Sequence, residues 1–112
     1  MRRGEIYFAD LSPTIGSEIN KRRPVLIVSN NANNRAANTV TVLPISSNIT
    51  GIFPFEVSIP STKSGLPKDS KVLAQQIRTI SKQRIVTGKT GLLDGKLMQA
   101  VDAAMKLHLA LS

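Results

Sequence analysis

The chain has 112 residues, enough for one compact domain over residues 1–112 and too short for two ordinary ones. Fifteen Lys and Arg against seven Asp and Glu give a formal net charge of +8, which favours a polyanionic partner and above all a nucleic acid. With no cysteine and a single histidine, disulfide and thiol chemistry are excluded, and we expect neither a metal site nor a cofactor.

Two segments share single features with membrane or export signals, but neither has the full pattern. The first ten residues begin with basic residues but lack the apolar segment of a signal peptide. Residues 36–55 carry no charge, yet they contain two prolines, a glycine and seven Ser, Thr or Asn residues. We therefore expect a cytoplasmic protein with no membrane partner.

The first half of the chain alternates strand patterns with polar loops. Ile6 and Phe8 alternate with polar neighbours and predict a strand over residues 5–11. Residues 12–23 are rich in Gly, Ser, Pro and charge, which is typical of a long exposed loop. The apolar run that follows predicts a buried strand over residues 24–29.

Further short strands are expected between residues 39 and 81. An Asn-rich turn or short helical turn over residues 30–38 precedes a β-branched strand over 39–45, where Pro44 indicates an edge or a bulge. After a loop, residues 55–59 form another strand pattern, and a turn-rich connection follows. Residues 71–81 contain two short strand-like pieces around Gln75 and Gln76.

The end of the chain has helical periodicity. Apolar residues recur on one helical face, and Asp94 stands ahead of them as a candidate N-cap. These apolar positions are 97, 98, 101, 104, 105 and 109. Five or six short strands and one terminal helix predict a mainly β fold, a small, strongly curved antiparallel barrel with a C-terminal α-helix. His108 lies beside the apolar face without a titratable neighbour, so we interpret it as structural.

Arginine and hydroxyl groups at strand ends are the main candidates for chemistry. Pro24 restricts the backbone and holds Arg23 at the rim of a rigid strand, where its planar guanidinium suits a phosphate. Ser46 and Ser47 end the next strand and could donate to the same phosphate. Gln75, Gln76 and Arg78 form a second polar row. Spacing alone leaves open that the arginines are solvated loop charges and that the serines only turn the chain.

Two other apparent motifs lack the residue spacing that their chemistry requires. The segment "TGKTG" at 87–91 lacks the glycine that a P-loop needs at position 83, where the chain has Gln83. The carboxylates are dispersed and form no pair suited to a glycosidase or a two-metal nuclease.

Four segments in order resemble the MazF/PemK family. They are "RRGEIYFADLSPTIGSE", "RRPVLIVSN", "TVTVLPISSNITG" and "QQIRTISKQR", and the similarity extends to the terminal amphipathic helix. The resemblance implies an SH3-like barrel, a homodimer and a bacterial toxin of a type II toxin–antitoxin pair. Such a toxin inhibits translation and growth by cutting single-stranded mRNA at short sequences without a metal, and a cognate antitoxin protein restrains it.

The resemblance also implies roles for individual residues. The essential arginine of the family falls on Arg23 and its catalytic hydroxyl on Ser46, where threonine is usual. That departure leaves open whether Ser46 or Ser47 acts. The glutamine and arginine of the last segment fall on Gln76 and Arg78, as RNA-contacting or supporting residues. We add Lys21 and Arg22 as electrostatic RNA contacts and Glu18 as a speculative base.

A metal-free ribonuclease uses the 2′-hydroxyl of its substrate as nucleophile, so the expected products are a 2′,3′-cyclic phosphate and a 5′-hydroxyl. Arg23 would stabilise the charge of the transition state. Loops 12–22 and 47–54 would read the bases, and Phe53 or Phe55 could stack on one of them.

Two other classes of protein use a similar small barrel. A basic SH3-like or OB-like barrel can bind RNA without cutting it. A toxin class on a similar barrel that poisons DNA gyrase uses a tryptophan near its C-terminus, and this chain has none.

Overall fold

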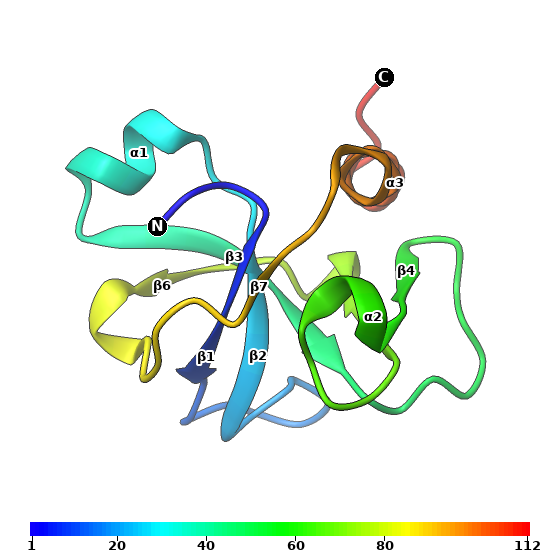
Figure 1. The fold of residues 1–112 in the computed structure, drawn as a ribbon, viewed down its shortest axis with the longest axis horizontal. Coiled ribbons are helices and arrows are strands. Elements are labelled where there is room, and N and C mark those ends of the chain that lie inside the picture. The colour runs from blue at the N-terminus through cyan, green and yellow to red at the C-terminus, as the bar shows by residue number, and fades with distance from the viewer.

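The computed structural model describes residues 1–112 and has one antiparallel sheet of seven strands with a helix after them (Figure 1). The sheet order is β4-β5-β3-β2-β1-β7, and β6 pairs with β3 as well. The strands are β1 (Glu5–Asp10), β2 (Arg22–Ile27), β3 (Thr39–Ser46), β4 (Glu56–Ile59), β5 (Ser70–Leu73), β6 (Arg78–Ser81) and β7 (Gly91–Leu92). The helices are α1 (Asn31–Ala36), α2 (Ser61–Ser64), α3 (Gly95–His108) and the 3₁₀ helices η1 (Ala74–Gln76) and η2 (Lys82–Arg84).

Strands β1, β2, β3 and β6 curl into a small barrel. The segment after β6 returns to β1, where Ile85 bridges Ala9 and the Val86 N–H donates to the Phe8 carbonyl at 2.9 Å. Eight buried side chains fill the interior, and they are Tyr7, Ala9, Leu11, Val25, Ile27, Val40, Val42 and Ile80. The predicted mainly β fold, a strongly curved antiparallel sheet with a C-terminal helix, is confirmed.

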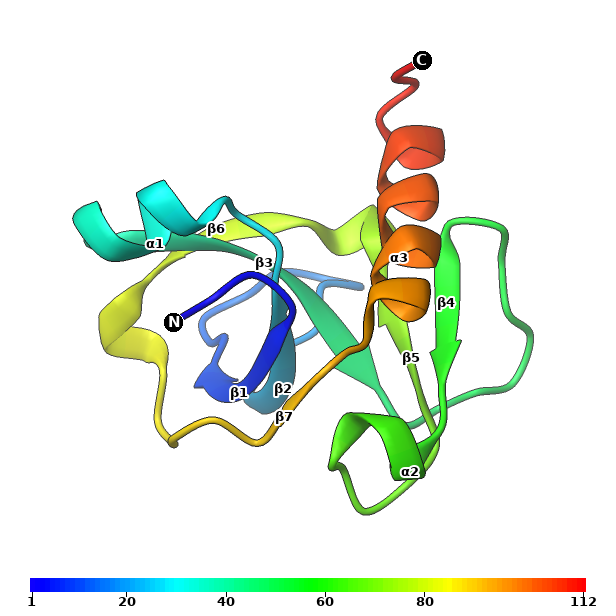
Figure 2. The same cartoon turned by 45° about the horizontal axis from the view of Figure 1, so that its top comes forward.

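The second core lies on the outer face of the same strands. Beyond the barrel, the sheet continues from β3 to β5 and then to β4, and α3 lies beside these strands (Figure 2). Leu26 and Val28 face this core, whereas Val25 and Ile27 face the barrel interior. Because both faces of β2 are covered, its sequence is continuously apolar and does not alternate.

Pro44 does not lie at a sheet edge, which was the first of the two alternatives, an edge or a bulge, that the sequence indicated. On one side it is in register with Val25 of β2. On the other side β3 changes partner at this point, from β6 at Val42 to β5 at Ile45. The proline therefore occupies the gap between two partner strands, where η1 replaces a ladder and no N–H is required.

Several strand boundaries differ from the predictions by one or two residues, and some short elements were not predicted. β2 begins at Arg22, so both arginines lie in the strand and not in the loop. The short α2 and the two-residue β7 were not predicted, because segments of this length carry no periodic signal. The backbones of α2 and β7 lie in direct contact, because a Cβ at Gly91 would lie 2.0 Å from the Ser64 carbonyl oxygen.

Helix α3 begins as the sequence predicted. The Asp94 side chain accepts a hydrogen bond from the Leu97 N–H at 2.9 Å, which confirms the N-cap. Most of the predicted face packs on the core, but Leu109 lies beyond the end of the helix and is 45% exposed. His108 is exposed and contacts the ring of Phe55 at a centroid distance of 6.0 Å, consistent with a structural role.

With 14 residues α3 is the longest helix, and no helix combines the length and apolar composition needed to cross a bilayer.

Candidate functional site

The two arginines at the start of β2 have different surroundings. Arg22 pairs with Asp10 in the ladder, and its guanidinium lies 5.8 Å from the centroid of the Phe8 ring. Arg23 pairs with Ala9, and its Nε donates to the Asn20 carbonyl at 3.2 Å. That bond steadies the Arg23 side chain while leaving its two terminal nitrogens for a ligand, and a guanidinium fork suits a phosphate.

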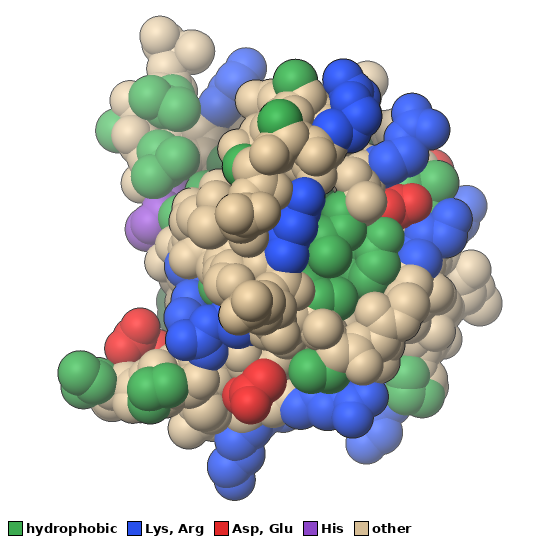
Figure 3. Space-filling model, turned by 90° about the vertical axis from the view of Figure 1, so that its left-hand side faces the viewer, with side chains coloured by type: hydrophobic (Ala, Val, Ile, Leu, Met, Phe, Trp, Pro, Cys, Tyr) green, Lys and Arg blue, Asp and Glu red, His purple; other side chains and the backbone are tan.

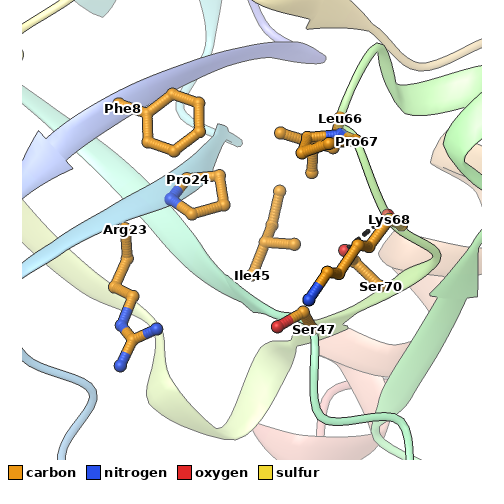
Figure 4. Close-up of a pocket in the computed structure, with 9 residues that line it drawn as sticks. All are labelled: Phe8, Arg23, Pro24, Ile45, Ser47, Leu66, Pro67, Lys68 and Ser70. Carbon is orange, nitrogen blue, oxygen red and sulfur yellow. Dashed lines mark hydrogen bonds between the residues drawn. The ribbon is translucent and has the colours of Figure 1, made fainter.

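Arg23 lies at a pocket of about 230 Å³ between the end of β2, the end of β3 and the segment that leads into β5. Figure 4 shows Arg23 on one side of the pocket and Lys68 with Ser47 on the other. The lining consists of Phe8, Arg23, Pro24, Ile45, Ser47, Leu66, Pro67, Lys68 and Ser70. Two cations and two hydroxyl residues without a carboxylate suit an anionic ligand.

Lys68 was not predicted as a site residue. It stands in the turn-rich segment between α2 and β5, more than twenty positions after Ser47 in the chain. The Ser70 hydroxyl donates to the Lys68 carbonyl at 3.0 Å and orders this segment. A single lysine in a polar turn has no distinguishing pattern, so only the fold reveals its place at the pocket.

The two candidate serines also differ. Ser47 lines the pocket, whereas the Ser46 hydroxyl accepts a hydrogen bond from the Asn48 N–H at 3.1 Å. The register that pairs Val25 with Pro44 would, two residues further, bring Arg23 opposite Ser46 on the neighbouring strand. Ser46 keeps its own O–H for donation, because it accepts in that bond. Both hydroxyls therefore belong to the Arg23 end of the sheet.

Four further predicted residues meet in a second pocket, of about 200 Å³. Its lining is Glu18, Ile19, Gln75, Gln76, Ile77 and Arg78. The Glu18 carboxylate accepts from the Ile15 N–H at 2.8 Å and does not line the pocket of Arg23.

Gln76 and Arg78 support the loop between β1 and β2. Gln76 accepts from the Ile19 N–H at 2.7 Å and donates to the Ser17 carbonyl at 3.2 Å, and Arg78 donates to the Leu11 carbonyl at 3.2 Å. Lys21 is exposed at the end of this loop and has a positive φ of 62°.

A buried polar cluster, also missed in the sequence, lies under the segment that joins β3 to β4. The Lys71 amino group contacts the Glu56 carboxylate at 3.0 Å, and their side chains are only 10% and 3% exposed. Gln75 Nε2 donates to the same carboxylate at 2.6 Å. Burial by itself would raise the pKa of Glu56, but hydrogen bonds from the Phe53 N–H, Gln75 and Lys71, with the lysine charge, hold that pKa below its usual value. The sequence offered one indication of this cluster, which is that Glu56 and Lys71 are charged residues within short predicted strands.

The surface is strongly basic, as the composition predicted. Figure 3 shows Lys and Arg side chains around an apolar patch on one face, with few acidic side chains among them. No group of three or more His, Cys, Asp or Glu side chains lies close enough to hold a metal ion.

The fold and the site together define a class: a small basic β-barrel protein in which an arginine, a lysine and hydroxyl groups line one pocket. The family described as the PemK-like, MazF-like toxin of the type II toxin–antitoxin system matches residues 2–109. The chain belongs to this family, and the resemblance inferred from its four segments is confirmed.

Curated relatives match over nearly the whole chain. Endoribonuclease EndoA of Bacillus subtilis is 44% identical, with 99% of this chain and 96% of the relative covered. Endoribonuclease MazF9 of Mycobacterium tuberculosis is 41% identical, with 99% and 98% covered.

Solved structures show the same fold. MazF from Deinococcus radiodurans superposes with a TM-score of 0.86 at 22% identity and covers 99% of this chain and 97% of its own. A mycobacterial endoribonuclease in complex with its cognate antitoxin gives a TM-score of 0.82 at 26% identity, with 100% and 97% covered.

Proposed function

We propose that the chain is a sequence-specific endoribonuclease that cuts single-stranded RNA without a metal, and that it is the toxin of a toxin–antitoxin pair. The observation that carries this proposal is the pocket in which Arg23, Lys68 and Ser47 meet without a carboxylate. Its relatives carry the name endoribonuclease, and such an activity on mRNA would inhibit translation and growth.

The reaction needs the substrate, the side chains of the pocket and a solvent water that accepts a proton. The ribose 2′-oxygen forms a bond to phosphorus as its proton passes to that water, and the bond from phosphorus to the 5′-oxygen breaks as that oxygen receives a proton from a cationic side chain of the pocket. The products are a 2′,3′-cyclic phosphate and a 5′-hydroxyl, and DNA is not cut because it lacks the 2′-hydroxyl. Arg23 and Lys68 stabilise the charge on the phosphoryl oxygens and donate toward the leaving oxygen.

The hydroxyl residues orient the phosphate. Ser47 contacts it from the pocket wall, and Ser46, opposite Arg23 by strand register, is the residue that the family resemblance favours. Comparing Ser46→Ala with Ser47→Ala separates these roles. The variant with the larger loss in kcat identifies the hydroxyl that contacts the reacting phosphate.

The rest of the RNA follows the basic surface. Lys21 and Arg22 attract the backbone through charge, and Glu18, Gln76 and Arg78 form the second pocket beside the first loop. Loops 12–22 and 47–54 read the bases. We propose a homodimer, and a cognate antitoxin whose acidic segment covers this basic surface.

Cleavage of single-stranded RNA in excess EDTA tests the proposal. Wild-type protein should produce 5′-hydroxyl ends, and Arg23→Ala should lower kcat by about 10²–10³ if this guanidinium stabilises the transition state. Arg22→Ala is the matched control, since its guanidinium lies over Phe8, and it should mainly weaken binding.

If the protein binds RNA but leaves it intact, the nuclease proposal is wrong, and the alternative of a non-catalytic RNA-binding barrel replaces it. If cleavage is unaffected by Arg23→Ala but abolished by Arg22→Ala, the essential arginine is Arg22 and not Arg23. Circular dichroism of each variant establishes that loss of activity is not loss of folding.

A further inference from the structure

Two neighbouring glutamines on η1 hold the two loops that flank the site, one glutamine for each loop. Gln76 contacts the loop between β1 and β2, and Gln75 contacts the cluster under the loop between β3 and β4. η1 joins β5 to β6, which both pair with β3, so its position relative to the barrel is determined by two ladders.

The side-chain amide of Gln76 bonds to the first loop through both its oxygen and its nitrogen. The side-chain oxygen accepts from the Ile19 N–H at 2.7 Å, and the nitrogen donates to the Ser17 carbonyl at 3.2 Å. One side chain thereby satisfies both a backbone donor and a backbone acceptor of this loop. The loop carries Ile15, which is 84% exposed, and leads into Arg23.

The second loop is tied to Gln75 through Glu56. Gln75 donates to one carboxylate oxygen at 2.6 Å, and the Phe53 N–H donates to the other at 3.0 Å. Lys71 then connects this carboxylate to the Gly51 carbonyl, at 3.2 Å. The anchored loop begins at Ser47, on the wall of the Arg23 pocket, and presents Phe53, which is 59% exposed and stacked on Phe55 at 5.5 Å.

We propose that Gln75 and Gln76 are positioning residues that determine the RNA sequence specificity, because they set where both base-reading loops stand relative to Arg23. The proposal rests on the proposed ribonuclease function. Neither glutamine need touch the reacting phosphate: a displacement of about 1 Å in a loop can change the rate about 100-fold when it misplaces a substrate. The loops offer apolar and aromatic surfaces, and bases stack on such surfaces with little preference, so discrimination depends on where they are held.

The test compares Gln75→Met, Gln76→Met and the double variant with wild type. Methionine keeps the length of the side chain and removes its hydrogen bonds. Gln75→Met also removes the side-chain oxygen Oε1, a buried acceptor that has no hydrogen-bond partner, which offsets part of the cost to folding. Gln83→Met is the matched control, because Gln83 is an exposed glutamine of η2 whose side chain makes no hydrogen bond.

Cleavage sites are mapped along one long single-stranded RNA, and kcat and KM are measured on an oligonucleotide that contains the wild-type site. We expect the double variant to cut at additional sequences and to lose roughly tenfold of its selectivity, mainly through KM, whereas Gln83→Met matches wild type. Gln76→Glu keeps an acceptor for the Ile19 N–H and should retain more selectivity than Gln76→Met.

An unchanged map of cleavage sites in the double variant would overturn the proposal, whatever happens to its stability. A fall in kcat with intact selectivity and KM would overturn it as well. If the double variant does not fold, each single variant is judged by the same two criteria.

Amide hydrogen exchange of the free protein gives a readout that needs no RNA. Faster exchange at Ile19 and Phe53, with unchanged exchange in β1–β3, supports the anchoring, and unchanged exchange at both contradicts it. Wild-type protein that cuts no RNA refutes the proposed function, and the anchoring is then decided by exchange alone.

Discussion

Lys71→Met should destabilise the protein strongly, and adding Glu56→Gln should restore most of the loss. The single substitution keeps an unbranched side chain but removes the charge that faces the Glu56 carboxylate. That carboxylate is 3% exposed, so it would remain buried without its cation. The double variant removes both charges and leaves an amide that can still accept from the Phe53 N–H.

The magnitude follows from burial. Breaking a buried pair by removing one partner costs about 3–5 kcal/mol, whereas replacing both charges is close to neutral. For 112 residues, each kcal/mol corresponds to about 4 °C in the melting temperature. We therefore expect Lys71→Met to lower the melting temperature by about 12–20 °C at neutral pH, and the double variant to melt within a few degrees of wild type.

Thermal unfolding followed by circular dichroism measures these differences, and Lys63→Met is the control. Lys63 pairs with Asp94 at 3.4 Å, but these side chains are 58% and 45% exposed, so its loss should hardly change the melting temperature. The pH dependence adds a second check. Because the pKa of Glu56 lies below its usual value, its contribution is present above about pH 4.5 and is lost as pH falls through the lower, folded-state pKa.

The deficit of Lys71→Met should therefore shrink in acid. If Lys71→Met and Lys63→Met destabilise the protein equally, or if the double variant is as unstable as the single one, the buried pair does not act as described.

Four other changes have definite expected outcomes. Lys68→Ala should lower kcat for RNA cleavage with little change in melting temperature, as measured by steady-state cleavage and thermal unfolding, because Lys68 is an exposed cation of the pocket that stabilises transition-state charge in the proposed reaction. Gly91→Ala should destabilise the protein in a denaturant titration, because the new Cβ would lie 2.0 Å from the Ser64 carbonyl oxygen. Leu26→Ala should cost about 2–5 kcal/mol in urea unfolding, since Leu26 is fully buried between the sheet and α3. Burial and the hydrogen bond to Glu5 raise the pKa of Tyr7 from 10.0 to about 12, so the folded protein should lose stability between these pH values. Tyr7→Phe should remove that part of the alkaline loss, and an unchanged profile would contradict the assignment.

The elements of the barrel were predictable where residue patterns are regular. The strands around Ile6, Leu26 and Val57 and the helix behind Asp94 were expected from period and capping, and the structure contains them. Pro44 indicated only an edge or a bulge, because the sequence of one strand cannot reveal that its partner strand changes beside it. β7 is held by backbone contact at Gly91, which leaves no pattern in so short a segment.

The candidate site was predictable in part. The position of Arg23 before Pro24 indicated a rigid, outward guanidinium, and Ser47 does lie at the same pocket. Glu18 was expected near the chemistry, but its side chain lines the second pocket and bonds to the Ile15 N–H. Gln75 was assigned to a polar row, and its contact with the buried Glu56 was not expected.

The sequence by itself determined a basic, mainly β chain with short strands, a capped terminal helix and the four segments that place it in its family. These properties depend on neighbouring residues, whose spacing is set by the local backbone geometry. Only the tertiary structure decided that Lys68 stands at the pocket of Arg23, and that Gln75 and Gln76 each hold a different loop. Such contacts join residues far apart in the chain through strand pairing and burial, and no local pattern specifies them.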